Sequence, residues 1–301
     1  MSRLLPTTKL LSVELLKIRK RWLFYILFLI MVLGAAVLIW LAGYSSWRGE
    51  RGGGDFEFTS SAMHTFALPW SLAALLDTGQ FWGGMLVGIL TASIVATEYS
   101  WGTVRLALSR GQTRNHYLTT KLIGIGIIAS AGMLLALAIG LIFSVIATNV
   151  AGLPVTFDTP DGPSFAGAVL MVVRAAYAVL PYGLLAFALT VVGRSTTIGV
   201  VGIVLFMFIE AIMIAVLGGL GGVGPDVRAF MIGHNVAALI AANRIGFTDY
   251  NSFAPREMLP DFELPDPFVA AFVIAVYCAI FLAIAYYVFQ KRDLGVESSG
   301  N

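Results

Sequence analysis

Charged side chains are scarce in this sequence. Asp, Glu, Lys and Arg make up 12% of the 301 residues, about half of the roughly 25% that is usual in soluble domains. Hydrophobic residues make up 58%, and the mean hydropathy is +0.86. So few charges cannot cover a water-soluble globule, and the surplus apolar surface must face lipid. The composition therefore excludes a soluble domain and predicts an integral membrane protein.

Groups that carry out chemistry are also missing. The one cysteine, Cys278, excludes a disulfide within the chain. No lysine is followed by Ser or Thr, as a phosphate-binding P-loop requires, and the one Gly-x-Gly-x-x-Gly pattern, at residues 219–224, follows an apolar run rather than a strand. The histidines are isolated, without the spacing of metal ligands. We therefore expect no enzyme activity in this chain, no cofactor, no metal and no nucleic-acid partner.

Six apolar runs are each long enough to cross the bilayer, which takes roughly 20 residues in a helix. Their length and their lack of two-residue alternation favour helices over barrel strands. We predict an all-α integral membrane protein with a cytosolic N-terminal segment (1–21), one transmembrane domain (22–292) and a cytosolic tail (293–301). The expected spans are about 22–42, 79–96, 122–148, 165–192, 196–217 and 267–289.

Lys and Arg are concentrated on one side of this layout. They lie before the first span, between the second and third, between the fourth and fifth, and after the sixth. The opposite loops are longer and collect most of the acidic residues. Because basic loops stay inside, both termini are expected in the cytosol, and the chain is expected to be a multi-pass protein of the cytoplasmic (inner) membrane.

Two segments outside the spans are predicted to be helices that do not cross the membrane. Residues 9–21 place apolar side chains at helical spacing among basic ones, which is typical of an interfacial helix on the inner leaflet. A basic orientation signal is the alternative interpretation. Residues 227–242 also have a helical pattern but are too short and too polar to span. We expect them to form a re-entrant or interfacial helix before the last span.

Two charged residues, Arg174 and Glu210, interrupt the fourth and fifth spans. Ionisable residues within a membrane are costly and mark candidate functional sites. Both lie at a similar depth on consecutive spans, which predicts an ion pair. The pair could simply fasten two helices or could line a translocation path. Alternatively, Arg174 could extend outward to the headgroups.

Gly84 and Gly88 lie four residues apart on the second span. This spacing allows two helices to approach closely. The contact could form within one chain or between two chains, and the sequence leaves both open.

The loop between the second and third spans, residues 98–113, is the most informative part of the sequence. Its middle can form a short helix ending at Gly111, since glycine readily adopts the left-handed conformation found after helix C-termini. We expect Trp101, Val104 and Leu108 to share one face of that helix, with Arg105 elsewhere. Such an apolar ridge among basic residues would fit a groove on another protein. The alternative is a basic loop that only sets topology.

This loop resembles the signature of permease subunits of ATP-binding-cassette (ABC) exporters of the type-two family. That family tends to carry an acidic residue at the end of span two, a Gly-Thr pair, leucines, an arginine and a lysine opening span three. The matching residues are Glu98, Gly102, Thr103, Leu106, Leu108, Arg114 and Lys121. The N-terminal helix, six spans and re-entrant segment extend the resemblance over the whole chain.

The resemblance implies a permease that moves an unknown substrate, with ATP hydrolysed by a separate cytosolic ABC ATPase. It also implies a second permease copy or paralogue in the same bilayer. The loop would then couple the ATPase to the spans, through Glu98, Trp101, Gly102, Thr103, Arg105 and Leu108. A secondary transporter and a non-transporting membrane scaffold are the alternatives.

Overall fold

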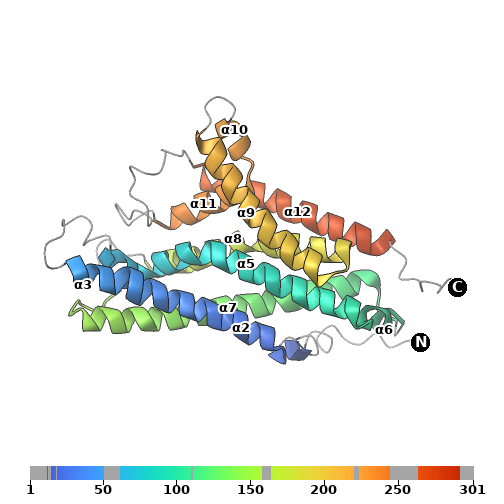
Figure 1. The fold of residues 1–301 in the computed structure, drawn as a ribbon, viewed down its shortest axis with the longest axis horizontal. Coiled ribbons are helices and arrows are strands. Elements are labelled where there is room, and N and C mark those ends of the chain that lie inside the picture. The colour runs from blue at the N-terminus through green and yellow to red at the C-terminus, as the bar shows by residue number, and fades with distance from the viewer. Residues whose placement is uncertain are drawn as a thin grey trace.

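The computed structural model describes residues 12, 15–17, 19–50, 62–109, 111–157, 164–219, 224–244 and 264–291. Within these ranges it contains helices and no strand. Six of the described helices are long and apolar enough to cross a membrane, and most run along the long axis of the molecule (Figure 1). The protein is therefore an all-α integral membrane protein with six spans, as the sequence predicts.

Each predicted span lies within one continuous helical stretch. The first comprises α2 (Trp22–Ala36), the π-helix η1 (Val37–Ser45) and α3 (Ser46–Glu50). The other five are α5 (Ser71–Ser100), α7 (Arg114–Val150), α8 (Phe165–Gly193), α9 (Thr196–Gly219) and α12 (Pro267–Lys291). Shorter elements are α6 (Thr103–Ser109), α10 (Gly224–Arg228), α11 (Ile232–Ala241) and the 3-10 turn η2 (Ala242–Arg244).

The two ends of the bundle differ in what they carry. The start of α2, the whole of α6 and the end of α12 lie at one end, and α3 lies at the other (Figure 1). We call these the α6 end and the α3 end. Of the predicted N-terminal interfacial helix, residues 12, 15–17 and 19 are described and helical, whereas Lys20 lies in a turn and Arg21 is the N-cap of α2. The other residues of that prediction, 1–11, 13, 14 and 18, and the predicted tail at 293–301 lie outside the described residues.

The helices α5 and α8 form the centre of the bundle. In each, 56% of the most apolar window is buried inside the protein, against 17–22% in the other four spans. The two helices pack against each other, and α9, α11 and α12 also pack on α8. The more exposed spans therefore present most of their apolar side chains outward, as expected for helices that face lipid.

Two glycines on α5 allow α8 and α9 to approach it closely. A Cβ built at Gly84 would lie 2.6 Å from Tyr182 on α8, and one at Gly88 would lie 2.8 Å from Ile203 on α9. Real side chains do not approach so closely. The Gly84 and Gly88 spacing thus serves packing within one chain.

Replacing Gly84 by Ala is expected to lower the free energy of unfolding by about 1–3 kcal/mol, because the new methyl group overpacks a buried contact. Gly83→Ala is a matched control, since a Cβ there meets nothing closer than Val179 at 3.8 Å. The midpoint of thermal unfolding in detergent measures both variants. Equal midpoints would contradict the close α5–α8 contact.

The helix α5 begins at Ser71, eight residues before the predicted start of the second span. The segment ahead of it is buried rather than looped out: Phe66, Ala67 and Leu68 are each at most 2% exposed. The hydroxyl of Ser144 on α7 donates to the Phe66 carbonyl at 2.6 Å and shares a 2.6 Å hydrogen bond with Ser71. The described residues 62–70, which the sequence assigns to the loop between the first two spans, therefore pack against α7.

A short helix precedes the last span, as predicted, but it covers residues 232–241 rather than 227–242, because the chain turns at residues 229–231. With ten residues, α11 is about 15 Å long, half of what the hydrocarbon core requires. It packs against α5, α8, α9 and α12. Seven of its residues are buried: Ile232, His234, Asn235, Val236, Ala238, Leu239 and Ile240.

Candidate functional site: the α6 end of the bundle

The short helix α6 is separated from its neighbours by two glycine turns. Gly102 precedes it with φ +67° and Gly111 follows it with φ +89°, both in the left-handed region that favours glycine. The hydroxyl of Thr103 donates to the Glu98 carbonyl at 3.2 Å, which ties the first residue of α6 to the end of α5. The predicted short helix and the left-handed Gly111 are confirmed.

The apolar face of α6 differs from the predicted ridge. Val104 is 2% exposed and packs into the bundle, and Leu108 is partly buried beside it. Trp101 is 73% exposed and Leu106 is 51% exposed. The predicted common face of Trp101, Val104 and Leu108 is therefore wrong. Trp101 is the C-cap of α5, and the turn at Gly102 takes it out of the helical register of α6.

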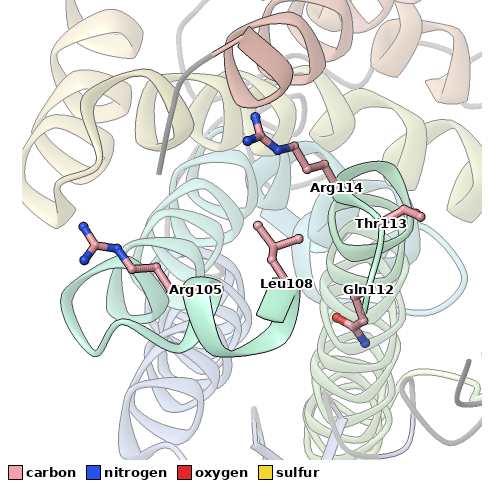
Figure 2. Close-up of a pocket in the computed structure, with 5 residues that line it drawn as sticks. All are labelled: Arg105, Leu108, Gln112, Thr113 and Arg114. Carbon is pink, nitrogen blue, oxygen red and sulfur yellow. The ribbon is translucent and has the colours of Figure 1, made fainter. Parts of the chain in front are cut away.

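Two pockets lie on either side of α6, and Arg105 borders both. The first, of about 430 Å³, is lined by Arg105, Leu108, Gln112, Thr113 and Arg114 (Figure 2). The second, of about 370 Å³, is lined by Tyr99, Ser100, Gly102, Val104, Arg105 and Arg194. The exposed guanidinium-bearing Arg105 therefore lies between the two pockets on α6, next to the exposed Leu106.

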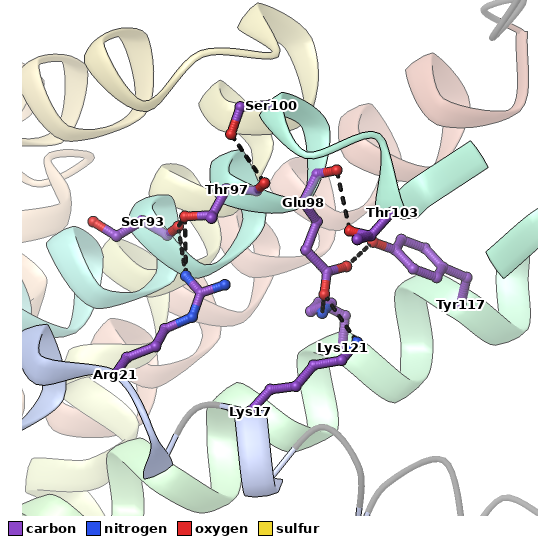
Figure 3. Close-up of polar contacts among 9 residues, drawn as sticks. All are labelled: Lys17, Arg21, Ser93, Thr97, Glu98, Ser100, Thr103, Tyr117 and Lys121. Carbon is purple, nitrogen blue, oxygen red and sulfur yellow. Dashed lines mark hydrogen bonds and ion pairs between the residues drawn. The ribbon is translucent and has the colours of Figure 1, made fainter. Parts of the chain in front are cut away.

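Beneath α6, the buried carboxylate of Glu98 contacts three polar side chains. Glu98 is 4% exposed, and its Oε1 lies 2.6 Å from the Nζ of Lys121, which is itself 2% exposed. Lys17 approaches the same oxygen at 3.5 Å, and the Tyr117 hydroxyl donates to the other oxygen (Figure 3). We call Glu98, Lys121, Tyr117 and Lys17 the Glu98 cluster. It joins the end of α5 to the start of α7 and to the segment before α2.

A second contact ties the start of α2 to α5. The Nη1 of Arg21 donates to the Ser93 carbonyl at 3.2 Å and to the Thr97 hydroxyl at 3.0 Å (Figure 3). The same guanidinium lies 5.9 Å from the centre of the Trp101 ring, within the range of a cation–π contact. The segment before the first span therefore packs beside the base of α6.

Sequence reasoning identified Glu98 but missed the partners that hold it. Lys121 entered only as part of a family signature, and Tyr117, Lys17 and Arg21 were not considered as site residues. One signal could have found the main pair. Glu98 and Lys121 are opposite charges at facing ends of consecutive apolar runs, and such charges are seldom buried unless they are paired.

The two intramembrane charges do not form the predicted ion pair. In the part of the chain that the structure describes, the Nη1 of Arg174 donates to the Ala242 carbonyl at 3.0 Å and to the Asn243 side chain at 3.4 Å. Glu210 instead accepts a hydrogen bond from the Gly233 amide at 2.9 Å. The prediction paired the charges by depth, but each instead contacts a backbone group at one end of α11. Glu210 lies nine positions from the end of α9, so its contact places the start of α11 beside the interior of that helix rather than at its end.

Comparison with known proteins adds the family. No curated protein matches the chain. A family model matches residues 79–295, from the second span to just beyond the last and thus more than two thirds of the sequence. That match includes α6, Glu98 and Lys121. The chain therefore belongs to the family described as "Protein of unknown function (DUF2705)".

Proposed function

We propose that this protein is the membrane-spanning permease subunit of an ATP-driven ABC exporter. In this proposal a separate cytosolic ATPase docks on α6, and a second permease copy or paralogue completes the transporter. The observation that carries the proposal is α6 itself. It is a short helix between two glycine turns, with Leu106 exposed on it, Trp101 exposed just before it and a buried ion pair beneath it.

The contacts under α6 support a coupling role. A docking partner that pushes on α6 would act on the Thr103–Glu98 contact, and Glu98 is bonded in turn to α7 through Lys121 and Tyr117. Buried hydrogen-bonded networks are rigid when they are fully satisfied. Movement of α6 would therefore reach α5 and α7 together.

The proposal requires the α6 end to face the cytosol. The concentration of Lys and Arg in the segments at this end supports that orientation in the cytoplasmic membrane. A cysteine replacing Ser109, in a Cys278→Ser background, is expected to resist a membrane-impermeant maleimide added to intact cells and to react after the cells are opened. Labelling in intact cells would contradict the orientation and, with it, docking of a cytosolic ATPase.

The proposed function is tested by reconstituting the permease with its partner ATPase. The full chain is purified in mild detergent from the membranes of its own cells, and co-purifying chains that contain a P-loop are identified by mass spectrometry. The permease and the P-loop protein that co-purifies with it are then reconstituted together into vesicles. The proposal predicts a stoichiometric complex whose ATP hydrolysis depends on the permease. Transport driven by an ion gradient without any ATPase would favour a secondary transporter, and the absence of both activities would favour a scaffold.

A further inference from the structure

Each end of the re-entrant helix α11 contacts an intramembrane side chain whose charge is opposite to that of the helix end. Glu210, on α9, accepts from the amide of Gly233 in the first turn. Arg174, on α8, donates to the carbonyl of Ala242, which is the C-cap. A helix carries partial positive charge at its N-terminus and partial negative charge at its C-terminus. The anion and the cation therefore both lie where the helix dipole favours them.

We propose that α11 is a brace between α8 and α9, and that Arg174 and Glu210 are its positioning residues, each acting on one end of α11 rather than on the other charge. This role concerns how the fold is held and does not depend on transport. This role explains why Arg174 and Glu210 are kept inside two different spans although they do not form an ion pair with each other.

The geometry separates the two charges along α11. The residues that they contact, Gly233 and Ala242, are nine positions apart, which corresponds to about 14 Å of helix. Coulomb attraction falls with distance, so each charge interacts more strongly with its own helix end, at 2.9–3.0 Å, than with the other charge. The backbone of α11 therefore lies between them.

Close packing at the start of α11 supports a specific contact with Glu210. A Cβ built at Gly233 would lie 3.2 Å from Oε2 of Glu210 and 3.0 Å from Ile214. Glycine thus lets the amide approach the carboxylate. At the other end, the side-chain amide of Asn243 donates to the Met171 carbonyl on α8 at 3.4 Å. Both ends of the segment are therefore fastened to spans by polar contacts.

The connection between α8 and α9 explains why a brace would matter. Only Arg194 and Ser195 join the two helices at the α6 end, and Arg194 adopts φ +49°. Towards the α3 end the chain does not connect them directly. The helix α11 packs on both helices there, so it fixes their separation where the tight turn cannot.

The test uses two buried valines as reporters in the full chain, held in lipid nanodiscs, with Cys278 replaced by Ser. Val236→Cys reports on α11 and Val191→Cys on the far part of α8; the parent valines are 3% and 1% exposed. The rate of reaction with N-ethylmaleimide is measured for Glu210→Gln, Arg174→Met and the double variant. Arg174→Lys keeps the cation and serves as the conservative variant.

Under the brace model, each neutralisation speeds labelling at position 236 by about fivefold to thirtyfold, the range expected for a partly buried charge at a helix end. The double variant multiplies the two factors, since opening α11 breaks both contacts. Labelling at position 191 keeps the parent rate, and Arg174→Lys labels more slowly than Arg174→Met.

Three results would overturn the proposal. A double variant that labels no faster than the single variants would mean that the two charges act on each other. Parent rates in all variants would mean that apolar packing alone holds α11. A parallel rise at positions 236 and 191 would mean that the charges support the whole fold rather than this helix.

Discussion

Replacing Lys121 by Met is expected to lower the free energy of unfolding by about 3–5 kcal/mol, the cost of removing one partner from a buried ion pair. Methionine keeps most of the length and apolar volume of the lysine stem, so loss of the charge dominates. Glu98 would then remain 4% exposed with its close cation gone. Unfolding in mixed micelles of detergent and SDS, followed by tryptophan fluorescence, measures the change.

Lys17→Met provides the matched control. Lys17 contacts the same carboxylate at 3.5 Å, but its side chain is 47% exposed, and exposed pairs are worth at most about 1 kcal/mol. The double variant Lys121→Met, Glu98→Gln should recover part of the loss, because no uncompensated charge stays buried. Equal losses for the Lys121 and Lys17 variants, or a double variant as unstable as Lys121→Met, would show that the buried pair is not what stabilises this end.

Much of the fold could be predicted because membrane spans depend on composition over about twenty residues. The start of α5 could not. Asp77, Thr78 and Gln80 lower the hydropathy just where the helix continues back to Ser71, and that extension is stabilised by Ser144 on α7. A hydropathy average over a short stretch of sequence cannot detect a contact between residues that are more than seventy positions apart, such as Ser71 and Ser144.

The errors at the candidate site have a similar physical origin. The predicted ridge assumed one helical register through residues 101–108, but Gly102 turns the chain between Trp101 and α6. The charged pair was predicted from depth along two spans. Helical depth says nothing about a third element, and α11 supplies nearer backbone partners for both Arg174 and Glu210.

What the structure changes is the choice of docking residues. Leu108 was expected on the apolar ridge that meets the ATPase, but it is partly buried and lines a pocket. Truncating it would mix lost packing with lost docking. Trp101 and Leu106 are exposed, and neither supports the core. They are therefore the side chains whose truncation isolates an interaction with a partner.

Trp101→Ala is expected to weaken association with the partner ATPase by about 2 kcal/mol, or roughly thirtyfold in Kd, because aromatic anchors near the centre of an interface commonly cost this much when truncated. Leu106→Ala should weaken it less, since aliphatic anchors are rarer hot spots. The free energy of unfolding should change little, as Trp101 is 73% exposed and its one described ring contact is with Arg21. Affinity is measured by titrating the purified ATPase onto the permease in nanodiscs.

Trp82→Ala is the matched control for Trp101→Ala. Trp82 is 52% exposed on the same helix, nineteen positions from Trp101 and thus about 28 Å along the axis, too far to share a docking surface at the α6 end. Its truncation should leave the Kd at the parent value. If the two tryptophan variants bind the ATPase equally well, α6 only sets topology. A coupling function would then have to lie elsewhere at the α6 end, in the segment before α2, in the α8–α9 turn at Arg194, or after α12.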